Sequence, residues 1–395
     1  MINIGLLPFY VGLFPIYIAT ILIILLILYW IKFKLQSPFW SKQPVVHKHN
    51  LFQKYSTPAI IYNDFYIPKF MNPIHIQTVS WRDVKDKNKL QKHISENFYK
   101  EKNGHYHPSL EKHIVPYYEN DTNAYTSTYI LDNILVGCIF NRTLHVHISG
   151  SSFNVSYIDY LCVHKGHRKN SVAPELIQTH EHFQRTKSTK KCKVSLFKKE
   201  GRLHKFIPLV EYKNCTYSLR NSDTFTNIKI NVPYTYQFTE VSLSMKKELV
   251  GFLEQIRQNK VCFIIPPLEI LLQLIERKSI QMYAMINQSS MNIIALYCFR
   301  NSGLYINSSK ESVECFASMY LNISIPIFTQ GFFKVIHKIK SNYSVLHLEE
   351  MGDNVHIMNV IRKADIKANY CVPCAYYLYN YSNKTVNAKD VTLLV

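Results

Sequence analysis

An uncharged amino-terminal segment constrains this chain more than any other feature of its sequence. No residue from Met1 to Ile31 is charged, and residues 16–31 read IYIATILIILLILYWI. An apolar run of about 20 residues is long enough to cross a bilayer as a helix, whereas the alternative is a buried core helix. The segment has no basic start and no small-residue cleavage site, so we expect a retained anchor rather than a removed signal peptide. Lys32 and Lys34 follow directly, and by the positive-inside rule they predict that the rest of the chain faces the cytoplasm.

The charge and the cysteines narrow the class of protein further. Among 395 residues, 46 Lys and Arg face 27 Asp and Glu, a formal charge of +19. Such a surface favours an anionic partner, which is nucleic acid, membrane headgroups or a phosphorylated small molecule. The nine cysteines are an odd number and are scattered, apart from Cys371 and Cys374. This spacing argues against a disulfide framework and for a reducing compartment.

The periodicity of apolar residues predicts a mixed α/β fold in two tandem units behind the apolar helix. We expect strands at 74–79, 125–131, 134–141 and 153–163, and helices at 83–99 and 174–183. A polar stretch at 222–234 then starts a second unit, with a strand at 236–241, a helix at 244–258 and a hairpin at 282–286 and 292–299. Closing strands are expected at 376–381 and 391–395. The predicted domains are therefore an anchor with its basic flank (1–35), a first α/β domain (36–225) and a second α/β domain (226–395).

Residues 157–174, YIDYLCVHKGHRKNSVAP, change abruptly from apolar to basic. A strand that ends in a polar loop and opens a helix makes an anion site, because the first N–H groups of a helix have no internal partner. Arg168 to Ser171 occupy that position, and Pro174 is tolerated in the first turn. The pattern predicts a phosphate or pyrophosphate ligand. A solvated basic turn that caps a helix is the alternative.

Five segments in order resemble one family. Arg168-x-x-Ser171-x-Ala173 is similar to the acyl-CoA pyrophosphate loop of the GNAT acetyltransferase fold. The run LCVHK at 161–165, which continues to VAP at 172–174, is similar to the hallmark of the N-myristoyltransferases (glycylpeptide N-tetradecanoyltransferases), in which that fold is duplicated. Four further segments agree with that family in order and spacing, and the resemblance covers residues 38–395. These segments are FWSKQPV at 39–45, LVG at 135–137, Asn141 with His145-Val146, and YYLYN at 376–380.

The resemblance implies transfer of a myristoyl group from myristoyl-CoA to an N-terminal glycine amine by direct attack, in a monomer without a metal. It places an oxyanion hole at the backbone N–H groups of Tyr160 and Leu161, and a base at the terminal carboxylate of Val395. It makes 36–225 the acyl-CoA-binding domain and 226–395 the peptide-side domain. Phe98, Tyr99 and Tyr106 would contact the peptide. The acyl-CoA would be held by Pro38, Phe39, Trp40, Cys162, Val163, Arg168, Lys169, Asn170, Ser171, Val172 and Ala173.

The peptide side departs from the family pattern. Residues 100–104 are net basic where the family has a run of acidic residues, and Asp159 stands where the family has asparagine. A loop with two glycines before YYLYN is replaced by residues 371–374, CVPC. We therefore expect a shifted peptide preference. Two alternatives stay open: an acyltransferase that acts on another amine, such as a lysine side chain, and a catalytically silent protein that binds acyl-CoA at a membrane.

Other candidate sites carry less weight. His145 and His147 alternate on a strand that we place after the 134–141 strand, and residues 180–182 read HEH, but neither group completes a zinc set. The basic run 185–199 is not accompanied by a nucleic-acid-binding module. We therefore expect neither a metal site nor a nucleic-acid partner.

Overall fold

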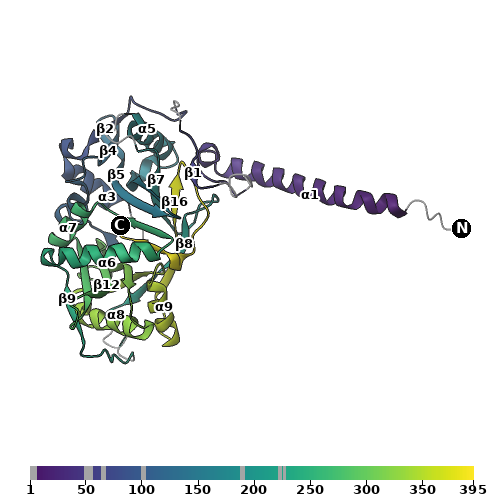
Figure 1. The fold of residues 1–395 in the computed structure, drawn as a ribbon. Coiled ribbons are helices and arrows are strands. Elements are labelled where there is room, and N and C mark those ends of the chain that lie inside the picture. Colours follow the sequence, from purple (N-terminus) through teal and green to yellow (C-terminus); the bar gives the residue numbers. More distant parts are fainter. Residues whose placement is uncertain are drawn as a thin grey trace.

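Helix α1 (Leu7–Gln36) extends away from the body of the protein in the computed structural model (Figure 1). The structure describes residues 7–48, 57–63, 68–98, 104–186, 192–220, 225 and 228–395, and side chains from Phe14 onward. From Phe14 to Gln36 this helix is long and apolar enough to cross a membrane, with a mean hydropathy of 2.5 and its apolar window exposed. The membrane crossing and the cytoplasmic orientation stay predictions.

The body is a mixed α/β fold built on one fourteen-stranded sheet, which confirms the predicted fold class. The strand order begins with β18 (Val391–Leu393), β10 (Cys262–Ile265), β5 (Ile134–Ile148), β6 (Ser151–Val163), β7 (Ser195–Glu200) and β16 (Tyr370–Tyr379). It continues with β8 (Val210–Ser218), β15 (Val345–Glu349), β14 (Val313–Tyr320), β12 (Ile293–Asn301), β11 (Ile280–Asn287) and β9 (Tyr236–Glu240). Strands β4 (Tyr125–Leu131) and β2 (Ile76–Ser80) branch from β5.

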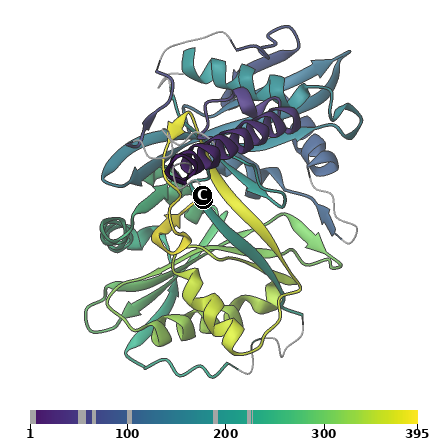
Figure 2. The same ribbon diagram turned by 90° about the vertical axis from the view of Figure 1, so that its right-hand side faces the viewer.

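Helices cover the sheet, and two short sheets complete the described part of the body. The helices are α3 (Lys87–Asn97), α4 (Val115–Tyr118), α5 (Val172–Thr186), α6 (Lys246–Asn259), α7 (Leu268–Glu276), α8 (Ile325–Ile339) and α9 (Asn354–Lys363). The short sheets pair β1 (Ala59–Ile60) with β17 (Tyr381–Ser382), and β3 (Gly104–Tyr106) with β13 (Leu304–Ile306). Figure 2 shows β16 and β8 running between the two halves.

The same chain path occurs twice. Strands β4, β5 and β6 form an antiparallel meander, helix α5 follows, and β7 pairs parallel with β6. Strands β11, β12 and β14 form a second meander, helix α8 follows, and β15 pairs parallel with β14. The boundary that we placed between residues 225 and 226 stays a prediction.

The first hairpin forms where the sequence placed it. Asp132 and Asn133 connect β4 to β5 with φ angles of 48° and 63°, the left-handed values that a two-residue hairpin turn requires. Strand β5 does not stop at Asn141 as expected but continues to Ile148, so His145 and His147 lie on it rather than on a separate strand. The reason is that β6 pairs with β5 along nearly its whole length.

One disulfide forms, although the cysteine spacing argued against a disulfide framework. Cys215 of β8 and Cys371 of β16 are bonded, and Cys374 is free and buried. The two bonded residues lie directly opposite each other in the register of β8 and β16, with their Cα atoms 4.1 Å apart. They are separated by 156 residues in sequence, so only the strand pairing reveals the bond.

The contact between α5 and β5 predicts the effect of adding one methyl group at Gly137. A Cβ at this residue would lie 2.8 Å from Leu176 Cδ1 and 3.0 Å from the Cys162 carbonyl oxygen, so Gly137→Ala forces the helix and strand apart. We expect a loss of about 1–3 kcal/mol in the free energy of unfolding, measured by chemical denaturation. Gly251→Ala in α6 is the control, because nothing lies within 4 Å of its Cβ. Equal stabilities of the two variants would contradict the prediction.

Candidate functional site

A β-bulge lies at the two residues that were predicted to form an oxyanion hole. Cys162 of β6 pairs with Cys138 of β5, and Asp159 pairs with Phe140, so Tyr160 and Leu161 lie together opposite the single residue Ile139. Bulged residues are released from the regular ladder of hydrogen bonds. Tyr160 has a φ of 46°, a left-handed value that costs a bulky residue about 1–3 kcal/mol.

The Tyr160 backbone N–H has an acceptor in this structure. It donates to Oδ1 of the neighbouring Asp159 over 2.9 Å. The Tyr160 ring is buried and contacts the rings of Phe98, Tyr106 and Phe140, with centroid distances of 5.4–5.6 Å to Phe98 and Phe140 and an Oη–Oη distance of 3.4 Å to Tyr106. The packing of this ring holds the backbone of the bulge in its left-handed conformation.

The basic loop after β6 has the geometry of an anion site. Lys169 and Ser171 have φ angles of 69° and 60°, and α5 begins at the next residue, Val172. Backbone N–H groups that converge around left-handed residues at the start of a helix make an anion-binding concavity. The side chains from Arg168 to Ser171 are exposed. Arg168 also anchors the loop, since its Nη2 donates to the Asn97 carbonyl oxygen over 2.5 Å at the end of α3.

Gln43 joins two of the segments that carried the family resemblance, 39–45 and 376–380, to helix α5. Its Oε1 accepts from Gln178 Nε2 of α5 over 3.1 Å and from Tyr379 Oη of β16 over 2.7 Å. Its own Nε2 donates to the Phe39 carbonyl oxygen over 3.2 Å. The predicted acyl-CoA residues at 38–40 are therefore connected through Gln43 to helix α5, which begins at the predicted residue Val172. Within that set, Phe39 is buried, Pro38 is exposed, and Trp40 is half-buried and stacks on Phe197.

The predicted peptide residues lie beside the bulge as far as the structure describes them. Phe98 is 42% exposed, and its ring contacts the rings of Tyr106 and Tyr160 at centroid distances of 5.6 Å. Tyr99 lies outside the described residues. Phe98 and Tyr106 therefore form an aromatic wall next to the backbone of Tyr160.

The carboxyl terminus is buried in the sheet and lies in the middle of the body (Figures 1 and 2). Val395 is 2% exposed, and β18 pairs parallel with β10 just before it. One oxygen of the terminal carboxylate of Val395 accepts a hydrogen bond from Nη1 of Arg300 on β12. The predicted base is therefore held by a cation in the structure.

Arg300 belongs to a buried set of charges, which we call the ion cluster and define as Lys198, Arg300, Glu314 and Glu349. Arg300 Nε lies 2.7 Å from Glu314, and Lys198 Nζ lies 3.5 Å from Glu314 and 2.6 Å from Glu349. Burial opposes the charge of Arg300, but Glu314, Tyr117 and Glu349 together outweigh burial and hold the pKa of Arg300 above its usual range. Burial raises the pKa of Glu349 to about 7, with the Lys198 cation opposing it.

Charges next to the bulge and in the ion cluster act on the same tyrosine, Tyr117. Burial raises the pKa of Tyr117, Arg300 and Arg142 lower it, and Asp159 and Glu314 raise it, so all four charges act on this one hydroxyl. Arg142 is itself buried, with its guanidinium 4.9 Å from the ring centroid of Tyr117. Asp159, next to the bulge, and the arginine that binds the terminus thus both affect the pKa of Tyr117.

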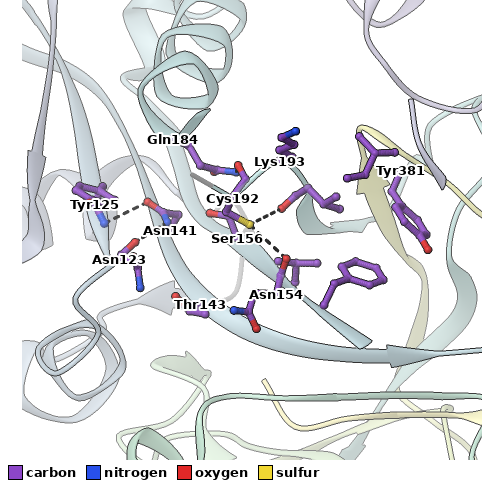
Figure 3. Close-up of a pocket in the computed structure, with 14 residues that line it drawn as sticks. Asn123, Tyr125, Asn141, Thr143, Asn154, Ser156, Gln184, Cys192, Lys193 and Tyr381 are labelled. Carbon is purple, nitrogen blue, oxygen red and sulfur yellow. Dashed lines mark hydrogen bonds between the residues drawn. The ribbon is translucent and has the colours of Figure 1, made fainter. Parts of the chain in front are cut away.

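A cavity of about 340 Å³ lies on the α5 side of β5 and β6 (Figure 3). Its volume is within the range of about 300–1,000 Å³ that is typical of ligand pockets. Its floor is made by Asn141 and Thr143 of β5 and Ser156 of β6, with Gln184 of α5 above them. The remaining lining residues are Ile60, Asn123, Tyr125, Phe153, Asn154, Val155, Cys192, Lys193, Val194 and Tyr381.

The histidines that we considered as metal ligands have other partners. His145 Nδ1 lies 2.5 Å from Asn154 Oδ1, His147 Nδ1 lies 2.9 Å from Ser152 Oγ, and His180 Nδ1 lies 2.7 Å from Ser127 Oγ. In the part of the chain that the structure describes, no group of three or more His, Cys, Asp or Glu side chains could hold a metal ion.

Sequence reasoning missed Arg300 and the residues of the cavity. Arg300 is a lone cation in the otherwise apolar strand IIALYCFRN at 293–301, and a charge in such a strand indicates a buried partner. The cavity residues carry no comparable signal, because they come from several separate strands and share no motif.

Comparison with known proteins bears out the family resemblance. Residues 67–205 match the family "Myristoyl-CoA:protein N-myristoyltransferase, N-terminal domain". The fold is that of the N-myristoyltransferase of Saccharomyces cerevisiae with bound myristoyl-CoA. One such structure superposes with a TM-score of 0.67 at 14% identity over 89% of this chain and 94% of that chain, and another with 0.70 at 13% identity over 91% and 94%. A search of curated protein sequences finds no match.

The ion cluster predicts a large effect of removing one charge. Lys198→Met leaves Glu314 and Glu349 buried with one cation fewer, and breaking a buried ion pair on one side costs about 3–5 kcal/mol. We expect a loss of this size in the free energy of unfolding, measured by chemical denaturation at pH 8. The control is Arg257→Met, whose pair with Glu254 is exposed and should contribute about 1 kcal/mol or less. A loss at Lys198 as small as the control would contradict the prediction.

Proposed function

We propose that this chain, in which residues 67–205 match the N-terminal domain of the N-myristoyltransferases and whose fold is theirs, transfers a myristoyl group from myristoyl-CoA to the N-terminal glycine amine of proteins. The observation that carries the proposal is the strand β6 with its bulge at Tyr160 and Leu161, followed directly by an anion-binding loop at the start of α5. This one continuous segment would thus supply backbone N–H donors to the thioester carbonyl and to the CoA phosphates.

The acyl-CoA would lie along this segment. Its phosphates would meet the exposed loop from Arg168 to Ala173, and Cys162 and Val163 would border the path to the bulge. Residues Pro38, Phe39 and Trp40 would contact the CoA from the other side, since Gln43 ties their segment to α5. Most of the surface that lines the cavity beneath α5 is apolar, although several lining residues are polar. This cavity would receive part of the acyl chain.

The chemistry needs a polarised carbonyl and a proton acceptor. The N–H groups of Tyr160 and Leu161 would stabilise the oxyanion as the amine nitrogen attacks the thioester carbon. The carboxylate of Val395 would take the proton that the ammonium loses before attack. The carbon–sulfur bond then breaks, and the CoA thiolate takes the second proton from nitrogen, so that an amide and CoA thiol are the products.

The acceptor peptide would enter along Phe98, Tyr99 and Tyr106. The protein would disfavour acceptor peptides that carry an early lysine, because residues 100–104 are net basic and would repel it. We further propose that α1 anchors a monomer in a membrane, with the two catalytic domains, 36–225 and 226–395, in the cytoplasm. The basic flank at Lys32 and Lys34 would face anionic lipid.

A direct assay tests the proposed function. The full-length chain in lipid nanodiscs is incubated with labelled myristoyl-CoA and a library of peptides that begin with glycine. We expect label in an amide at the N-terminal amine of a subset of peptides that lack an early lysine. Transfer only to lysine side chains would favour an acyltransferase for another amine. Binding of myristoyl-CoA without transfer to any amine would show a silent acyl-CoA-binding protein and overturn the proposal.

Extending the chain by one residue beyond Val395 tests the base. The extension moves the carboxylate away from its buried position, and loss of a general base costs about 10²–10⁴-fold in rate. We expect a fall of this size in kcat, with myristoyl-CoA affinity within about twofold of the unmodified chain. Val395→Leu keeps the terminal carboxylate and is the control. An unchanged kcat in the extended chain would exclude the terminal carboxylate as the base.

A further inference from the structure

We propose that the carboxylate of Asp159 closes the oxyanion site in the free protein, and that the cationic amine of the acceptor opens it by binding this carboxylate. The inference rests on the proposed acyl transfer and adds an acceptor-binding residue to it. The consequence is that the thioester is activated only when an amine is present, so that hydrolysis of the acyl donor by water is suppressed.

A hydrogen bond at the bulge occupies one of the two oxyanion donors. Asp159 Oδ1 accepts from the backbone N–H of Tyr160 over 2.9 Å. This N–H is one of the two donors that would bind the thioester oxygen, and the carboxylate and the thioester oxygen compete for it. Loss of a single donor from an oxyanion hole lowers kcat about 10²–10³-fold. The resting contact therefore holds the site in a poorly active state.

The Tyr160 N–H that donates is fixed in place, whereas the Asp159 carboxylate that accepts can move. The Tyr160 backbone is held at a φ of 46° by the bulge and by its ring, which is 8% exposed and packs against Phe98 and Phe140. The Asp159 side chain is only half-buried and can rotate about two bonds. The amide thus stays aimed at the carbonyl position while the carboxylate leaves.

Among the described residues, Asp159 has no cationic side chain as an ion-pair partner. Arg300 is bound to Glu314 and to the terminal carboxylate of Val395, and the Arg142 guanidinium lies between the rings of Tyr117 and Tyr157. No Lys, Arg or His side chain in the described part of the chain forms an ion pair with Asp159. A half-buried carboxylate without a cation next to a reacting carbonyl favours an ammonium ligand, because charge pairing offsets desolvation.

Electrostatics gives the carboxylate its selectivity. A negative charge beside the thioester opposes the oxyanion that forms during attack, since like charges repel strongly where water is excluded. A bound ammonium neutralises this charge, whereas a water molecule does not. Asp159 therefore favours attack by an amine that arrives as a cation and disfavours attack by water.

The experiment compares Asp159→Asn and Asp159→Ala with the unmodified full-length chain in nanodiscs. Release of CoA from myristoyl-CoA is measured without an acceptor, which reports hydrolysis, and with an N-terminal glycine peptide that the unmodified chain accepts. Asp159→Ala removes the group that occupies the Tyr160 N–H, and we expect acceptor-free hydrolysis to rise about tenfold or more. Asp159→Asn keeps an acceptor oxygen but loses the charge, so we expect acceptor-free hydrolysis to rise less than in Asp159→Ala and the KM for the peptide to rise about tenfold or more.

The control is Asp132→Asn in the exposed turn between β4 and β5, which should change neither quantity. Acceptor-free hydrolysis and peptide KM that stay unchanged in both Asp159 variants, while the unmodified chain transfers its acyl group, would overturn the inference and leave the proposed function intact. Equal losses of kcat in both variants, without a change in the ratio of hydrolysis to transfer, would show a structural role only. No transfer by the unmodified chain to any amine would overturn the proposed function and this inference together.

Discussion

The pairing of β5 with β6, with one bulge near its end, is the constraint on which the rest of the structure depends. The register runs unbroken from Ile148 opposite Ser151 to Phe140 opposite Asp159, and it then skips one residue. Both faces of this pair are packed, so a shift of one residue would move every side chain to the wrong face. The packing therefore fixes the position of the bulge, and with it the direction of the Tyr160 N–H and the start of the loop that leads into α5.

The carboxyl terminus makes the second half of the chain part of the same site. Strand β10 comes from the second half but pairs with β5 of the first, and β18 pairs with β10 at the edge of the sheet. Arg300 then connects the buried terminus to Glu314 and so to the ion cluster. Because desolvated charges must be paired, stability and chemistry depend here on the same few residues. The terminus is a structural element and the proposed base at once.

Much of the fold and part of the site could be predicted from the sequence, because the signals are local. The Asp132–Asn133 turn, strand β4 before it, the start of β5 and the helix that opens after Ser171 were placed within a few residues, since turn residues and apolar periodicity act over short distances. The oxyanion residues came from the family resemblance rather than from any local pattern. The Cys215–Cys371 bond was not predicted, since pairing across 156 residues leaves no trace in cysteine spacing.

By itself, the sequence determined the apolar first helix, the first meander with the helix that follows it, the hairpin of the second unit and the basic loop at Arg168, all of which follow from neighbouring residues. Only the tertiary structure decided that Arg300 binds the terminus, that Gln43 joins α5 to β16, and that the Asp159 carboxylate occupies the Tyr160 N–H. These contacts depend on strand register and on the burial of charge, which residues distant in sequence determine together. The chemistry of the site is set by such contacts, because a hydrogen bond or an ion pair needs its two partners within about 3 Å.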